Sequence, residues 1–121
     1  MNREIKFRAW DKERKVMENC ISINPFFVSD CDRRTWKHNE VELMQYTGLK
    51  DRNGKEIYEG DIVQIPLNIK EYFNCEVKFN DGCFDVIQGN FRDYLKVYIA
   101  NRCVKVIGNV HENPELLKEA K

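Results

Sequence analysis

The sequence has no excess charge of either sign and no long hydrophobic run. Its 121 residues hold 20 Lys and Arg against 20 Asp and Glu, so there is no global field of the kind that drives strong non-specific binding to nucleic acid. No apolar run approaches the about 18 residues of a membrane-spanning helix, and the N-terminal MNREIKFRAW is charged at once. We therefore expect a cytoplasmic protein with neither a signal peptide nor a membrane partner.

Residue types that commonly carry catalysis are scarce or scattered. The only histidines, His38 and His111, lie in no Ser or Cys arrangement typical of nucleophilic catalysis. The six glycines stand singly, without GxGxxG or GxxxxGK[ST], so no nucleotide-binding loop is predicted. Glu59 and Asp61 bracket Gly60, and alternate strand residues that point the same way would make them paired carboxylates flanking a cleft. Acids at such a corner more often bond nearby backbone N–H groups or a basic neighbour, which is the interpretation that we favour. We expect a protein that is not an enzyme and has no catalytic residues and no cofactor.

The cysteines show no metal-binding or disulfide pattern. Their number is odd and CxxC spacing is absent: Cys20, Cys31, Cys75, Cys83 and Cys103. Structural zinc sites usually bring ligands in close pairs, which the combination of Cys20, Cys31 and His38 does not. A disulfide between Cys75 and Cys83 is not expected in a reducing compartment. We interpret all five as free thiols, several of them small core residues, and expect no metal site.

The sequence does contain short alternating apolar patterns separated by turn residues. A chain of this length, 42% hydrophobic and 12% aromatic, suits one packed core, so we expect a single domain over residues 1–121. Residues 4–10 alternate apolar and charged side chains and, with the charged turn that follows, predict a first hairpin over residues 4–18. Residues 21–28 form a second β-like run, in which Pro25 favours an edge strand or a bulge because it has no N–H to donate.

The pattern continues through the second half. Alternation predicts strands over residues 41–46 and 75–79, and Asn80-Asp81-Gly82 predicts a hairpin turn before a returning strand at residues 83–87. Residues 91–99 fit helical as well as strand spacing, and the β-forming Val-Tyr-Ile favours a strand for their second half.

The C-terminal part of the sequence predicts a β-bulge or close approach, followed by a short helix. Gly108 falls within a Val-rich β region as a bulge or close approach, and Asn113-Pro114 predicts the start of a short C-terminal helix. The predicted fold is mainly β, a single domain of antiparallel hairpins forming a small barrel-like, partly open sheet with that helix.

The stretch Met44–Ile65 carries the densest turn signals, MQYTGLKDRNGKEIYEGDIVQI. Asn and Gly tolerate the positive φ of a short loop, so Asp51, Asn53 and Gly54 predict a hairpin connection. Gly60-Asp61 then redirects the chain into a β-forming run. We interpret the motif residues as structural rather than chemical: Gly48, Asp51, Asn53, Gly54, Gly60 and Asp61.

With these blocks in view, the chain resembles the YopX family of phage and prophage proteins. The segments REIKFRAWDKERKVM, LMQYTGLKDRNGKEIYEGDIV and VIGNVHENPELL look like that family's blocks, in order and at suitable separations, whereas residues 20–40 and 64–103 match only loosely. The resemblance implies a mainly β fold with barrel-like sheet packing, a bacteriophage or lysogenic host context, and no assigned activity or catalytic residues. The GDIV run also resembles strands of small Tudor-like and KOW-like barrels, an analogy of fold that does not fix function.

The favoured function is a non-enzymatic phage or prophage accessory protein that binds a host or phage protein in the bacterial cytoplasm. The polar segment at residues 29–39 is predicted to be a long, mobile loop. Aromatic and basic side chains in and before it are the candidate partner-binding residues: Phe26, Phe27, Arg33, Arg34, Trp36 and Lys37.

Two alternatives stay open. The first is a nucleic-acid-binding small β-barrel that uses Arg33, Arg34 and Lys37 for phosphates and Trp36 for base stacking. The second is a self-assembling structural protein, because a sheet with edge strands offers a route to homo-oligomers.

Overall fold

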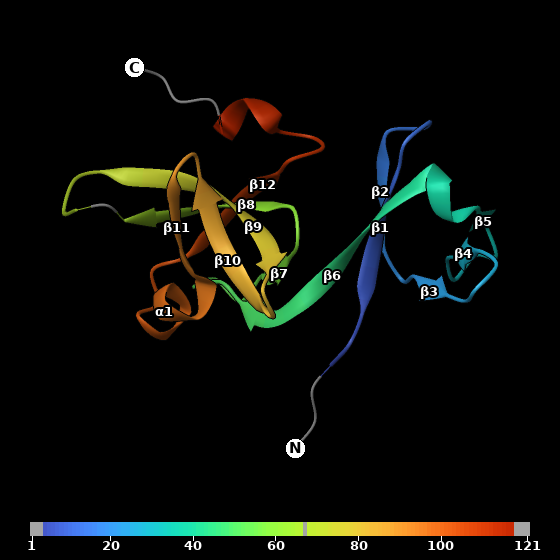
Figure 1. Ribbon diagram of the computed structural model, residues 1–121, viewed down its shortest axis with the longest axis horizontal. Coiled ribbons are helices and arrows are strands. Elements are labelled where there is room, and N and C mark those ends of the chain that lie inside the picture. The colour runs from blue at the N-terminus through green and yellow to red at the C-terminus, as the bar shows by residue number, and fades with distance from the viewer. Residues whose placement is uncertain (1–3, 67, 118–121) are drawn as a thin grey trace. The chain divides into compact units, whose positions relative to one another are not determined.

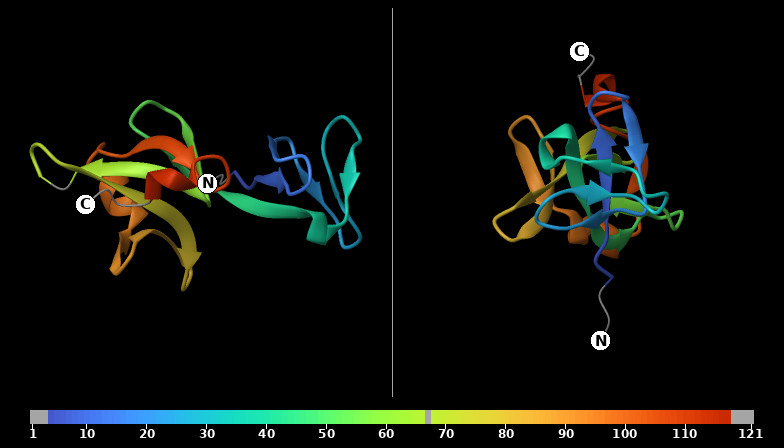
Figure 2. Two further views of the ribbon diagram at one scale, coloured as in Figure 1. Left: turned by 90° about the horizontal axis from the view of Figure 1, so that it is seen from above. Right: turned by 90° about the vertical axis from the view of Figure 1, so that its right-hand side faces the viewer.

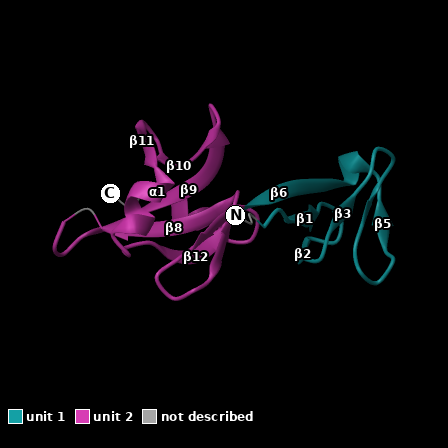
Figure 3. Cartoon of the chain, turned by 90° about the horizontal axis from the view of Figure 1, so that it is seen from below, with its two compact units in different colours: residues 1–46 teal, residues 47–121 magenta. Residues whose placement is uncertain are grey.

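The computed structural model describes residues 4–66 and 68–117, and it confirms a mainly β fold (Figure 1). The chain divides into two compact units, Met1–Tyr46 (unit 1) and Thr47–Lys121 (unit 2), shown in separate colours in Figure 3. Strand β6 (Val41–Lys50) begins in unit 1 and ends in unit 2. The interpretation of residues 1–121 as one domain stays a prediction. No helix in the described ranges is both long and apolar enough to cross a membrane.

Unit 1 starts with the predicted hairpin. Its central strand, β1 (Phe7–Asp11), pairs with β2 (Val16–Glu18) on one side and with β6 on the other, all antiparallel. Ala9 in β1 is fully buried and packs with Val28, Trp36 and Val41 in the small core of this unit. The expected half-buried alternation over residues 4–10 is wrong: the strand begins at Phe7, Ile5 is 62% exposed, and both faces of β1 are buried from Arg8 to Asp11.

The segment after the first hairpin is more ordered than the sequence indicates. A small antiparallel sheet and a single 3₁₀ turn occupy it: β3 (Ser22–Ile23), β4 (Val28–Ser29), β5 (Thr35–Trp36) and η1 (His38–Glu40). Two predictions are therefore wrong. Pro25 lies in the turn between β3 and β4 rather than on an edge strand or bulge, and residues 29–39 are not one long loop. The strands have only two residues each, too few for a period of two to be visible in the sequence.

Unit 2 is built on a curled five-stranded antiparallel sheet in the order β11-β10-β9-β8-β12. Figure 2 shows these strands, yellow-green to orange-red, as a curved sheet rather than a flat one. The strand bounds are β7 (Glu56–Tyr58), β8 (Asp61–Pro66), β9 (Tyr72–Asn80), β10 (Cys83–Gln88), β11 (Phe91–Tyr94) and β12 (Lys105–Asn109). The predicted hairpin at Asn80–Gly82 is confirmed by the pairing of Cys83 with Asn80. Strand β7 pairs with the end of β6.

The ambiguous residues 91–99 divide into a strand and a helix. Residues Phe91–Tyr94 form β11, and α1 (Leu95–Ala100) follows, so the preference for a strand in the second half is wrong. Leu95 is fully buried, and Tyr98 and Ile99, three and four residues later, pack against the same core. Burial of this i, i+3, i+4 face outweighs the β propensity of Val-Tyr-Ile, since propensity is a weak prior beside packing.

The bulge and the short helix near the C-terminus lie where the sequence predicts them. The pairing of β12 with β8 shifts between Val106 and Gly108, which confirms a bulge. A Cβ added to Gly108 would lie only 2.5 Å from Asn113 Oδ1, so the glycine is also a close approach. The short helix is a 3₁₀ turn, η2 (Pro114–Leu117).

Candidate functional site

A cluster of exposed apolar side chains stands at the turn between β3 and β4. Phe26 is 83% exposed, and Ile23 and Phe27 are each 40% exposed. We call these three residues the apolar tip. Exposed aromatic side chains grouped on one turn are typical of contact surfaces.

The turn that carries the apolar tip is held by Asn24. Its Oδ1 accepts hydrogen bonds from Phe26 N (2.8 Å) and Phe27 N (2.9 Å), and its own N–H donates to Phe27 O (3.1 Å). Pro25 fixes φ at the second position of this turn. His38 Nε2 donates to the carbonyl oxygen of Asn24 at 2.8 Å, which ties the turn to η1. Phe26 is thus presented on a fixed backbone.

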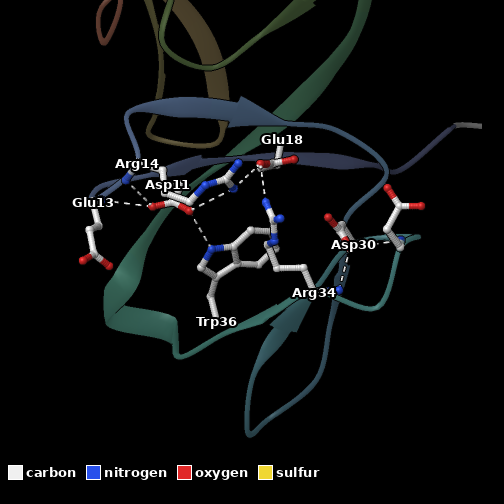
Figure 4. Close-up of polar contacts among 8 residues, drawn as sticks. Asp11, Glu13, Arg14, Glu18, Asp30, Arg34 and Trp36 are labelled. Carbon is white, nitrogen blue, oxygen red and sulfur yellow. Dashed lines mark hydrogen bonds and ion pairs between the residues drawn. The ribbon is translucent and has the colours of Figure 1, made fainter.

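Trp36 lies in the interior of unit 1. It is only 7% exposed, and its indole N–H donates to Asp11 Oδ2 at 2.9 Å (Figure 4). The expectation of an exposed Trp36, available to a partner or a base, is therefore wrong. The polar composition around this residue hid the short strand β5, which turns the ring inward.

Asp11 organises the polar side of the same unit. Its Oδ1 accepts from Glu13 N (3.0 Å) and Arg14 N (2.9 Å), and its Oδ2 accepts from Trp36. Burial by itself would raise the pKa of the Asp11 carboxyl, but the Arg14 and Glu13 N–H groups and the Trp36 indole outweigh it and hold the pKa below its usual range. Asp11 therefore acts as an ionised structural acceptor.

The three basic candidates differ in their surroundings. Arg34 Nη1 lies 3.6 Å from Glu18 Oε2, which Arg14 also contacts at 3.0 Å (Figure 4). Arg33 and Lys37 are exposed, and Arg33 has a positive φ of 68°. A cleft of about 470 Å³ beside them includes Arg34 and Trp36, but it also holds Asp11, Glu13 and Glu40. Its mixed charge does not favour a phosphate backbone.

Removing the indole N–H tests the role assigned to Trp36. Trp36→Phe leaves the buried Asp11 carboxylate without one charge-assisted donor, and we expect a loss of about 2 kcal/mol in the free energy of unfolding. Urea unfolding followed by the remaining tryptophan, Trp10, measures it. The control, Arg34→Gln, removes an exposed ion pair and should cost under about 0.5 kcal/mol. Equal losses in the two variants would contradict the assignment.

The central motif residues Asp51, Asn53 and Gly54 form the connection from β6 to β7. Asp51 N donates to Lys55 O (2.8 Å) and Gly54 N donates to Asp51 O (2.9 Å), which closes the loop, and Gly54 has the positive φ of 84° that the turn requires. Asp51 Oδ1 accepts from Asn53 N and Lys55 N, and Oδ2 accepts from Val106 N, each at 2.9 Å. The carboxylate thus joins the hairpin to β12.

The Gly60-Asp61 corner serves the backbone in the same way. Asp61 is buried, and its Oδ2 accepts from Tyr58 N at 2.8 Å. Gly60 has a φ of 84°, donates to Val77 O and accepts from Val110 N, both at 2.8 Å. Gly48, also at a φ of 84°, lies within β6. These residues therefore form turns and join strands through backbone contacts.

Sequence reasoning missed a basic cleft in unit 2. It has a volume of about 380 Å³ and is lined by Lys50 and Arg52 from the central hairpin and by Arg102 from the turn after α1. The two segments lie about fifty residues apart in the sequence, and nothing in their local patterns links them. Only the pairing that brings Arg52 N to Val104 O, at 2.9 Å, places them together.

The described residues hold no cluster of three or more His, Cys, Asp or Glu side chains suited to a metal ion. Cys75 is buried and pairs with Val63, whereas the exposed Cys83 pairs with Asn80, so these two thiols are not cross-strand neighbours. Burial raises the pKa of the Cys75 thiol to about 12. Cys20 and Cys31 are both exposed.

Fold and site together define a small, mainly β protein made of antiparallel hairpins, with a conspicuous apolar tip and a basic cleft. Its sequence matches the family model described as YopX protein over residues 6–118, and the chain belongs to this family. It is 40% identical, over an alignment of 131 positions, to the SPbeta prophage-derived uncharacterized protein YopX of Bacillus subtilis (strain 168), covering 95% of this chain and 97% of that protein.

Two solved structures share the fold. The crystal structure of protein EF1440 from Enterococcus faecalis matches with a TM-score of 0.71 and 30% identity, covering 97% of this chain and 100% of that one. The crystal structure of protein yopX from Bacillus subtilis matches with a TM-score of 0.66 and 27% identity, covering 93% and 97% of the two chains. The expected family resemblance is confirmed.

Proposed function

We propose that this YopX-family protein is a non-catalytic accessory protein that binds a host or phage protein through the apolar tip. The observation that carries the proposal is the 83% exposure of Phe26 on a turn fixed by Asn24. A buried Phe removes about 150–250 Å² of surface from water, so one such ring inserted into a pocket supplies much of an interface's energy.

The fixed turn strengthens this proposal. An anchor that is already held in place loses little conformational entropy on binding, and such pre-organisation raises affinity. The hydrogen bonds within the turn and the His38 contact hold its backbone before any partner arrives. Lys37, exposed and next to His38, adds positive charge at the edge. The proposed partner is thus a protein with an apolar pocket and an acidic rim, encountered in the bacterial cytoplasm.

The nucleic-acid alternative loses its stacking residue, because Trp36 is buried and bonded to Asp11. The apolar tip offers two phenyl rings, but the cleft that includes Arg34 and Trp36 has mixed charge. A protein pocket therefore fits this part of the chain better than a phosphate backbone does.

Site-specific cross-linking tests the proposal. A photo-reactive phenylalanine analogue at position 26, in the full chain expressed in a lysogenic or phage-infected host, is expected to cross-link to one protein. Phe26→Ser should weaken the affinity of the purified pair at least tenfold, because it removes a large buried anchor. The analogue at position 69 is the matched control, since Ile69 is 97% exposed in unit 2. The same cross-links from both positions, or unchanged affinity of Phe26→Ser, would overturn the proposal.

A further inference from the structure

The basic cleft of unit 2 collects three cations that have no acidic partner. Lys50, Arg52 and Arg102 line it and are exposed, and no ion pair or side-chain hydrogen bond involves them within residues 4–66 and 68–117. Like charges gathered without a counter-charge repel one another, and an anion bound between them relieves that repulsion. The cations are therefore available to a ligand.

The carboxylate that lines the cleft, Asp51, is already hydrogen-bonded to backbone N–H groups. Asp51 is only 7% exposed, and both of its oxygens accept N–H groups of Asn53, Lys55 and Val106. It cannot swing out to pair with a cation without leaving those donors unsatisfied. Three cations against one carboxylate leave two positive charges in excess, which matches a phosphate monoester carrying roughly −1.5 to −2 charges at pH 7.

The position of Arg102 gives a second observation. It is the first residue beyond the C-cap of α1 and has a φ of 55°. Its N–H donates to Ile99 O at 3.0 Å, and Cys103 N donates to Tyr98 O at 3.2 Å, which together close the helix in the way that usually places glycine there. An arginine in left-handed conformation costs energy that glycine would not. Backbone strain of this kind clusters at functional sites, which is consistent with a role for the Arg102 side chain in the cleft.

The rest of the cleft suits a small ligand. Ile99 and Val104 give it an apolar wall, and its volume of about 380 Å³ falls at the lower end of the range for small-molecule sites. The guanidinium groups of Arg52 and Arg102 are suited to bidentate contact with phosphate oxygens, and Lys50 supplies a point charge.

We propose that the basic cleft binds the phosphate group of a small phosphate monoester, held by Lys50, Arg52 and Arg102 with its organic part against Ile99 and Val104. This site is separate from the apolar tip, so the two proposals stand or fall independently. No covalent step is involved.

Titration calorimetry on the full chain tests the proposal, with inorganic phosphate, ribose 5-phosphate, AMP and phosphate-free adenosine as probes. The phosphate-bearing probes are expected to bind and adenosine is not. Lys50→Gln, Arg52→Gln and Arg102→Gln should each weaken binding about tenfold, in line with the loss of one charge-assisted contact. The control, Lys15→Gln with Lys70→Gln and Lys78→Gln, removes three exposed lysines elsewhere, more charge than any single cleft variant, and should leave affinity within about twofold.

Arg102→Gly separates binding from folding. Glycine relieves the left-handed strain, so the melting temperature should stay the same or rise while ribose 5-phosphate affinity falls about tenfold. No binding by wild type, or equal weakening in the control triple variant, would overturn the proposal. A single-stranded oligonucleotide that binds with steep salt dependence while the monoesters do not would also overturn it, in favour of a nucleic-acid backbone.

Discussion

Oxidised glutathione is expected to join Cys20 and Cys31 of the folded protein in an intramolecular disulfide. Strands β3 and β4 pair Ser22 with Ser29 and Ile23 with Val28, so the same register continued by two residues sets Cys20 opposite Cys31. The two thiols interact: a hydrogen bond with Cys20 is the main reason that the pKa of the Cys31 thiol is raised. Both side chains are exposed to a reagent.

The bond forms at the open end of the hairpin that carries the apolar tip. The two thiols lose two hydrogens, and the glutathione disulfide is reduced to two molecules of glutathione. Closing the loop of residues 20–31 should stabilise the protein by about 3 kcal/mol in the chain-entropy description. The expected result is a mass loss of about two daltons for the disulfide itself, a raised melting temperature, and slower amide exchange between β3 and β4.

The other cysteines supply the controls. Cys83→Ser should leave the oxidation unchanged, and Cys20→Ser should abolish it. Cys75, with its thiol pKa raised to about 12 by burial, should stay unlabelled by a thiol reagent at pH 8 in both redox states. Peptide mapping that finds Cys31 bonded to another cysteine, or no loss of two free thiols, would contradict the register argument. If the Cys20–Cys31 disulfide forms as expected, the interpretation of all five cysteines as free thiols holds under reducing conditions alone.

Asp51→Ala is expected to cost about 3–5 kcal/mol in the free energy of unfolding, because three backbone N–H groups lose a charged acceptor at once. These donors belong to Asn53, Lys55 and Val106, and the Val106 bond is largely buried. Asp51→Asn keeps one acceptor oxygen and should lose less. Chemical denaturation followed by circular dichroism measures both variants. A loss below about 1 kcal/mol for Asp51→Ala would mean that the carboxylate does not hold the hairpin to β12.

The same carboxylate predicts an acid dependence. Burial by itself would raise the pKa of Asp51, but the N–H groups of Val106, Lys55 and Asn53, with the charge of Lys55, outweigh it and hold the pKa below its usual range. A group whose pKa is lower in the folded state stabilises the fold above its unfolded pKa of about 3.9 and loses that contribution as the pH falls through the folded value. The stability difference between wild type and Asp51→Ala should therefore be constant above about pH 5 and shrink below about pH 4. A difference that grows in acid would contradict this sign.

Much of the fold follows from local patterns in the sequence. The hairpins at Asn53-Gly54 and Asp81-Gly82 were predictable because short connections need positive φ, and few residues supply it. The long strands β6 and β9 were predictable because they have enough residues for alternation to be seen. The family resemblance came from the same turn-rich blocks, whose residues the structure uses for backbone contacts.

The elements that were predicted wrongly are of two kinds. In one, local propensity conflicts with burial; in the other, the element has too few residues to show a pattern. Helix α1 forms from residues that favour β-strands because the face of the helix that carries Leu95 is buried in the core. Strand β5 has two residues, and so the burial of Trp36 and its bond to Asp11, 25 positions away, had no local signal.

By itself, the sequence determined the mainly β class, the turns and the structural use of Asp51 and Asp61, since each depends on residues within a few positions of one another. Only the tertiary structure decided which side chains are on the surface and which meet: Phe26 outward and Trp36 inward, the thiol of Cys20 within hydrogen-bond reach of Cys31, and Lys50 and Arg52 beside Arg102. These depend on strand pairing and burial between distant segments, which a local period cannot encode.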